Sequence, residues 1–179
     1  MTLISQAILA QAVITVNGMG MNERVALADE IFRHQPNLLA SVLVQQRMGA
    51  SHPQIDVLLN LLFVVYQAMK ISGYVWPVIS EQTQERCLQR LTARARFVEG
   101  LTPELMEQAV EQQINVHGER YLLAYVHGTL GEHGLLAVRT EAEKYLLLAA
   151  LNLVDCVAAT KVTRSQATTS RSSRSATRR

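Results

Sequence analysis

Aromatic side chains are scarce in this sequence, where Phe, Trp and Tyr together make up 5% of the 179 residues. Runs of β-branched and aromatic residues, which are typical of strands, are also few. Hydrophobic residues nevertheless account for 49% of the chain, which is enough for a sizeable core. That core must be built from Leu, Val, Ala, Ile and Met, whose side chains suit helix packing. The composition therefore predicts an all-α fold of single-domain size.

Cysteine is nearly absent, since the chain contains only Cys87 and Cys156. A small disulfide-bonded domain needs a higher cysteine density, so a disulfide scaffold is excluded. Both residues lie inside apolar patterns with helical spacing. We therefore expect two buried free thiols.

Targeting and membrane-spanning signals are also missing. The N-terminus lacks the positively charged region of a secretory signal. The apolar segment Val57–Met69 is shorter than the about 20 residues that cross a bilayer. The second apolar segment, Tyr145–Ala159, contains Asn152 and Asp155. These observations predict a cytoplasmic protein without a membrane span.

The segment Ile55–Ile71 is the most apolar part of the chain, and its apolar residues fall on every side of a helix. A helix of this kind is normally buried on all sides. We expect it to be the central helix of a bundle of six or seven helices. The last apolar segment, Tyr145–Ala159, is expected to contact it.

Helix start signals divide the rest of the chain. Pro36 suits the first position of a helix, and Thr102-Pro103-Glu104 combines a cap, a proline and an acid in the first turn. Thr140 and Glu143 match a capping box. We expect the helix before Pro36 to start after an Asn22 cap and to bury Val25 and Phe32. Whether Gly118 interrupts a helix is left open by the sequence.

A polar segment follows the predicted helical domain, which spans residues 1–162. Residues 163–179 contain many Ser and Thr residues and no large apolar residue, so we expect a disordered tail. The net charge of the whole chain is +2. The tail holds five arginines and no acid, so the rest of the chain has a net charge of −3. A flexible basic segment can bind nucleic acid or another polyanion, or simply act as a solubilising terminus. The tail arginines are Arg164, Arg171, Arg174, Arg178 and Arg179.

Two stripes of opposite charge follow helical spacing. Arg86, Arg90 and Arg94 lie four residues apart and can contact an anion or an acidic partner, or form a solvated face. The acidic stripe consists of Glu104, Glu107 and Glu111. Its acids suit a helix N-terminus. We expect the two stripes to pair within or between subunits in preference to a metal site, since no Glu-x-x-His pattern occurs.

Histidines and carboxylates gather late in the chain. His117, Glu119, His127 and His133 offer the side chains of a zinc site or a general acid–base pair. Their spacing matches no pattern with a known mechanism, and surface or capping roles are common for histidine. The sequence also lacks the Gly-Lys-Ser/Thr end of a P-loop and the Gly-x-Ser-x-Gly turn of a hydrolase. We therefore predict no cofactor and favour a non-enzymatic protein.

Self-association or binding to another protein is the function that the sequence favours. Val57, Leu61, Val64 and Val65 lie away from the Leu58–Leu62 side of the central helix. A thin bundle would leave some of these residues exposed, and exposed apolar area normally marks an interface. We therefore expect a homodimer or a protein partner. The alternatives are a nucleic-acid-associated protein that uses its arginines and a small enzyme that uses the late histidines.

Overall fold

The computed structural model describes residues 2–98 and 102–164, and this part of the chain is all-α apart from two strands of two residues each. The prediction of an all-α fold is confirmed. Eight helices occur among the described residues, in the order α1 (Gln6–Asn17), α2 (Met21–His34), α3 (Pro36–Arg47), α4 (His52–Ile71), α5 (Glu81–Val98), α6 (Pro103–Val116), α7 (Arg120–Glu132) and α8 (Glu141–Ala159).

Local capping fixes most of these helix starts. Pro36 is the first residue of α3, as predicted. Thr102 caps α6, because its hydroxyl accepts a hydrogen bond from the Leu105 N–H at 3.4 Å. Thr140 and Glu143 form the predicted capping box of α8, with reciprocal hydrogen bonds of 3.1 and 3.2 Å. These helix starts could be predicted from the sequence because each depends on residues within one helical turn.

The break between α6 and α7 raises the number of helices above the six or seven expected. His117 has an extended backbone with φ −70° and ψ 142°, which ends α6. The backbone N–H of Glu119 then donates to His117 Nδ1 at 3.0 Å instead of continuing the helix. The chain therefore turns at Gly118, and α7 starts at Arg120.

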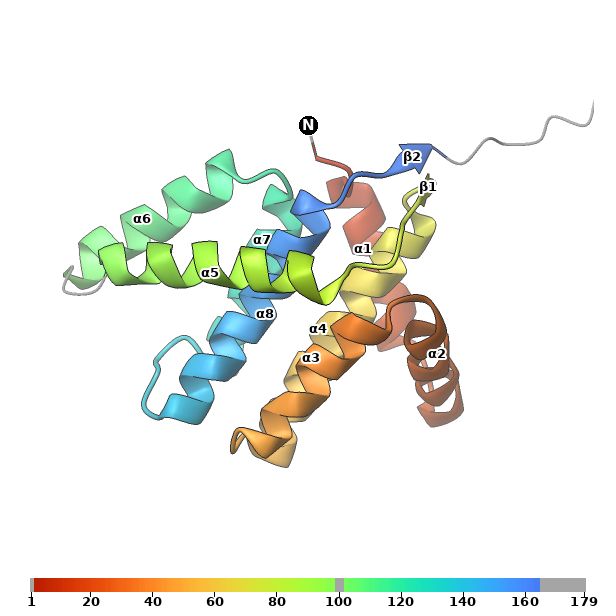
Figure 1. The fold of residues 1–179 in the computed structure, drawn as a ribbon, viewed down its shortest axis with the longest axis horizontal. Helices are drawn as coiled ribbons and strands as arrows, with labels where there is room; N and C mark the ends of the chain where they lie inside the picture. Colours follow the sequence, from red (N-terminus) through yellow and green to blue (C-terminus); the bar gives the residue numbers. More distant parts are fainter. Residues whose placement is uncertain (1, 99–101, 165–179) are drawn as a thin grey trace, which may run out of the picture.

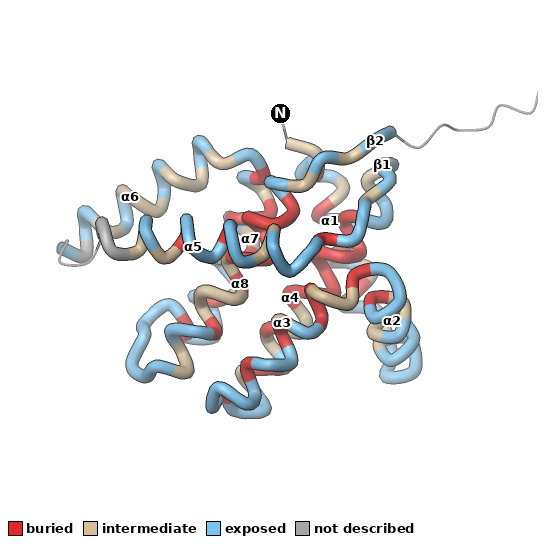
Figure 2. The backbone as a smooth tube through the Cα atoms, viewed as in Figure 1, coloured by how far each residue is buried: buried red, intermediate tan, exposed pale blue. Residues whose placement is uncertain are grey.

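Helix α4 forms the centre of the molecule, as predicted. It packs against α1, α3 and α8, with smaller contacts to α2 and α7, so its apolar sides are all occupied. Figure 2 shows the buried residues gathered around α4, α7 and α8. The buried residues of α4 are Ile55, Leu58, Leu61, Leu62, Phe63, Val64, Val65, Tyr66, Gln67, Ala68 and Met69.

This packing overturns the argument from surplus apolar residues on α4. Leu61, Val64 and Val65 have no exposed surface, and Val57 is half-buried. The helices of the chain itself cover these side chains, so α4 leaves no large apolar face for a partner. Any apolar interface must lie elsewhere.

Among the described residues, α4 is the one helix long and apolar enough to cross a membrane by length and composition. Within the fold, 61% of its most apolar stretch is buried by other parts of the chain. Burial in the core accounts for its composition, because a helix surrounded by other helices is apolar on all sides.

Helices α5 and α6 extend together to one side of the molecule (Figure 1). The first part of α5 packs along α8, and α6 packs against α7. None of the described side chains of α6 is buried. Helix α2 lies at the opposite end, against α3 and α4.

A short antiparallel ladder lies beside α4. Strand β1 (Tyr74–Val75) pairs with β2 (Thr163–Arg164), with Tyr74 opposite Arg164 and Val75 opposite Thr163. The first two residues of the predicted tail therefore contact the helical domain. The rest of that tail, residues 165–179, lies outside the described residues.

Candidate functional site

A group of polar side chains joins three helices at the base of the α5–α6 projection. His117 Nε2 lies 3.0 Å from Asp155 Oδ1, and Arg94 forms an ion pair with the other oxygen of the same carboxylate. Only about 10% of the Asp155 side chain is exposed, whereas 43% of the Arg94 side chain is exposed. The carboxylate of α8 thus receives hydrogen bonds from α5 and from the α6–α7 turn.

The position of the ring proton on His117 follows from its two partners. Nδ1 accepts the hydrogen bond from the Glu119 backbone N–H, so it carries no proton. The proton therefore lies on Nε2, which donates to Asp155. Because both ring nitrogens are occupied, His117 has no free lone pair with which to take a proton from a substrate. This arrangement favours a structural role over general acid–base catalysis.

Glu119 links the same turn to the start of the chain. Its carboxylate accepts hydrogen bonds from the backbone N–H groups of Leu3 at 2.7 Å and Ile4 at 3.1 Å. Only 2% of Glu119 is exposed, and this burial raises the pKa of its carboxyl although the two N–H donors act in the opposite direction. The side chain thereby fixes the segment that precedes α1.

The other two histidines of the predicted cluster do not join this network. His127, on α7, has no hydrogen-bond partner at either ring nitrogen, and burial lowers its pKa from 6.5. His133 follows α7, where its Nδ1 lies 2.9 Å from the Thr129 carbonyl oxygen. The structure therefore brings together His117 and Glu119 only. No group of three or more His, Cys, Asp or Glu side chains within 2–98 and 102–164 is arranged to hold a metal ion.

The arginine stripe divides into residues with different surroundings. Arg94 pairs with Asp155, whereas the exposed Arg86 hydrogen-bonds the Thr83 hydroxyl at 3.3 Å. Arg90 is exposed as well. In the part of the chain that the structure describes, no ion pair joins this stripe to the acids of α6, which are Glu104, Glu107 and Glu111. The expected pairing within one chain is therefore not formed there.

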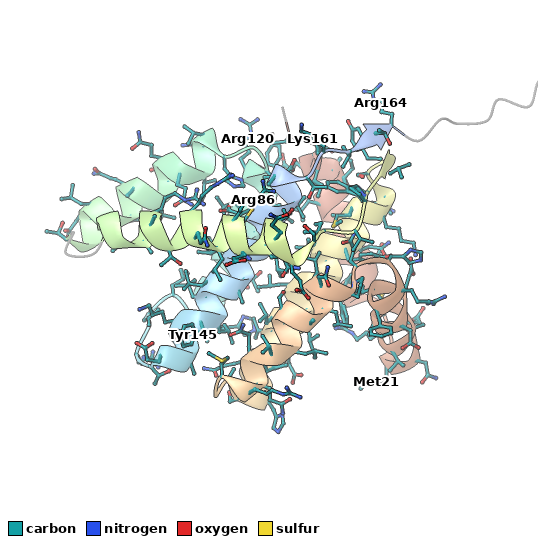
Figure 3. All side chains as sticks on the ribbon, viewed as in Figure 1. Met21, Arg86, Arg120, Tyr145, Lys161 and Arg164 are labelled. Atoms are coloured by element: carbon teal, nitrogen blue, oxygen red, sulfur yellow. The ribbon has the colours of Figure 1, made fainter. Side chains whose placement is uncertain are left out.

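Of the five tail arginines, Arg164 lies within the described residues. Arg164 is exposed at the end of β2 and is labelled in Figure 3. Four further arginines lie outside the described residues, namely Arg171, Arg174, Arg178 and Arg179.

A hollow opens beside the Arg94–Asp155–His117 network. It has a volume of about 490 Å³ and is open to solvent on one side. Its lining is polar on the network side and contains one thiol, from Cys87. The residues around it are Cys87, Arg90, Ala93, Arg94, His117, Asp155, Ala158 and Ala159.

Asp155 is the one residue of this network that was not predicted as a site residue from the sequence. Its signal was present, since an acid in the middle of the apolar segment Tyr145–Ala159 needs a partner when it is buried. The identity of that partner could not be read, because Arg94 and His117 lie 61 and 38 residues away along the chain.

The outer face of α2 is a second candidate site, of a different kind. We call Met21, Val25, Ala28 and Phe32 the α2 seam. Met21 is 76% exposed, Val25 53% and Phe32 66%, whereas Ala28 is half-buried and packs against the core at the edge of this row. The prediction that α2 buries Val25 and Phe32 is wrong, because α2 packs on its neighbours through a different face. Figure 3 labels Met21 at the outer end of this helix.

Comparison of the chain with protein-family models, with curated proteins and with solved structures gives no significant match.

Proposed function

We propose that this protein acts by self-association, as a non-enzymatic helical protein whose two copies pair through the α2 seam. The main support for this proposal is the exposure of three large apolar side chains on one side of α2. Isolated exposed apolar residues are common on protein surfaces, but a row of them along one helix is typical of an interface.

The spacing of the seam suits packing against another helix. Its members follow one another at intervals of four, three and four residues, which is the spacing of the apolar positions in a heptad. The buried residues of α2, Leu27 and Ile31, lie on the face towards α3 and α4. The helix is thus anchored on one face and apolar on another.

The charges of α2 favour a second copy of the same helix as the partner. Glu23 lies in the first turn, whereas Arg33 and His34 lie in the last turn. Two copies related by a two-fold axis can run antiparallel, which brings Glu23 of each helix towards Arg33 of the other. Such an interface is self-complementary, as the interface of a symmetric dimer must be.

The polar site supports a non-enzymatic role. The ring nitrogens of His117 are both engaged, and the Asp155 carboxylate is shared between His117 and Arg94. These groups join helices that lie far apart in the sequence, so their arrangement is explained by folding without a substrate.

Sedimentation or light scattering of the full chain tests the proposal. We expect the wild-type protein to have twice the 19.9 kDa mass of one chain at micromolar concentration. Phe32→Glu places a charge in the seam and should give a folded monomer, because the residue is already exposed in one chain. Val116→Glu is the matched control, since Val116 is 78% exposed on α6 and should leave the dimer intact.

Two results would contradict the proposal. A wild-type protein that has the mass of one chain at all accessible concentrations would exclude self-association. A dimer that withstands Phe32→Glu but dissociates in the Val116→Glu variant would place the interface on α6 instead of α2.

A further inference from the structure

We propose that Cys87 and Cys156 form a peroxide-responsive thiol pair, in which oxidation through the hollow joins α5 to α8 by a disulfide bond. Both cysteines are free and buried, with 3% and 0% of their surface exposed. They come from two helices that pack extensively on each other. The chain contains no other cysteine, so an intramolecular disulfide can join only these two residues.

The two thiols are neighbours in the core. Asn152, on α8, donates to the Gln84 carbonyl oxygen of α5, and Asp155 pairs with Arg94, so these two contacts hold α8 against α5 on either side of Cys87 and next to Cys156. Burial raises the pKa of Cys156, and Cys87 raises it further. A disulfide needs the two Cα atoms within about 7 Å of each other, a separation that side chains buried between two packed helices can reach. The fold therefore already brings together the two residues that would be joined.

Access to the pair is one-sided. Cys87 lines the hollow together with Arg90 and Arg94, whereas Cys156 lies behind it and is not part of the lining. A small oxidant that enters the hollow meets Cys87 first. Because Cys156 does not line the hollow, an oxidant in the hollow does not reach it, and Cys156 is left for the second, resolving step.

The reaction consumes one hydroperoxide molecule and is balanced in two steps. In the first step, the Cys87 sulfur attacks a peroxide oxygen, the O–O bond breaks, and the departing hydroxide takes the thiol proton to become water. In the second step, the Cys156 sulfur attacks the sulfenic sulfur of Cys87 and the S–O bond breaks. The departing hydroxide takes the Cys156 proton, so two thiols are oxidised to a disulfide and hydrogen peroxide is reduced to two water molecules.

Treatment of the full chain with hydrogen peroxide tests this assignment, with intact mass and thiol alkylation under denaturing conditions as readouts. We expect the loss of two hydrogen atoms from the single-chain mass, no alkylated cysteine, and recovery of both thiols after reduction. Cys156→Ser should stop at a sulfenic acid on Cys87, which a cyclic dione traps. Cys87→Ser should leave Cys156 as a free thiol.

Three outcomes would overturn the proposal. Two alkylated cysteines after peroxide treatment would show that the hollow does not admit the oxidant. An intact mass that gains oxygen atoms and loses no hydrogen atoms would show that Cys156 does not resolve the sulfenic acid. A disulfide found only between two chains would show that the contact within one chain is not the reactive one.

Discussion

His117 donates a hydrogen bond from Nε2 to Asp155 Oδ1 over 3.0 Å, and this contact ties the turn between α6 and α7 to the middle of α8. The other ring nitrogen is also engaged, since Nδ1 accepts from the Glu119 N–H. Arg94 adds a contact from α5 to the same carboxylate. One acid therefore holds three segments that are distant in the sequence.

Asp155→Asn is expected to lower the free energy of unfolding by about 2 kcal/mol, because the amide has no charge and its single oxygen cannot replace both carboxylate oxygens, one of which pairs with Arg94 while the other accepts from His117. The loss falls below that of a fully buried ion pair, since water screens the 43% exposed Arg94 side chain. Urea unfolding measures the change. Arg94→Gln is the comparison, and it should cost less because it leaves the His117 contact in place. Equal stability of Asp155→Asn and the wild type would show that the network does not support the fold.

Glu119→Gln tests the attachment of the segment before α1. The amide side chain carries an NH₂ group, which cannot accept from the Leu3 and Ile4 N–H groups as the second carboxylate oxygen does. We expect faster amide hydrogen exchange at Leu3 and Ile4 and a loss of about 1 kcal/mol in stability. Glu111→Gln, at an exposed position on α6, is the control. Unchanged exchange at both amides would exclude the anchoring role.

The central helix could be predicted because its signal is local. Apolar residues on every side of Ile55–Ile71 indicate burial whatever the neighbours are. Helix starts such as Thr102-Pro103 were predictable for the same reason, since a cap and its partner lie within one turn. The start of α2 was less clear, and its first residue is Met21, one position before the predicted Asn22 cap.

The exposed seam and the polar site were not predictable, because both depend on tertiary packing. Helix α2 is apolar on more than one side, and only its position against α3 and α4 decides that Ile31 is buried while Phe32 is exposed. The partners of Asp155 come from two other helical segments. The same limitation applies to α4: its burial was predicted, but whether the other helices also cover Val64 and Val65 depended on the fold, and they do.

Leu62→Asp tests the position of α4 at the centre of the core. Leu62 has no exposed surface, so the variant buries a charge without a partner and is expected to cost more than about 4 kcal/mol. Thermal unfolding followed by circular dichroism measures the effect. Leu43→Asp is the matched control on α3, where the side chain is 48% exposed and the cost should stay below about 1 kcal/mol. A similar melting temperature for the two variants would contradict the assignment of α4 as the core helix.

His127 is expected to make the fold less stable in mild acid. Burial lowers the pKa of His127 in the folded state below its ordinary 6.5, so the unfolded chain binds this proton more readily. The stability that the neutral His127 ring contributes to the fold is therefore fully present above pH 6.5. It is lost as the pH falls from there towards the folded-state pKa. Glu119 acts with the opposite sign, because its raised pKa favours the folded state as the pH falls.

His127→Leu isolates this effect, since it removes the titrating ring and its two unpartnered nitrogens while keeping an apolar side chain on α7. The measurement is the free energy of unfolding between about pH 7.5 and 5.5, where we expect the wild-type stability to fall relative to that of the variant. His133→Leu, at an exposed histidine, should retain the wild-type slope. If the free energy of unfolding depends on pH in the same way for the wild type and for His127→Leu, the ring is protonated equally in the folded and unfolded chains. In that case water reaches the ring in the folded chain.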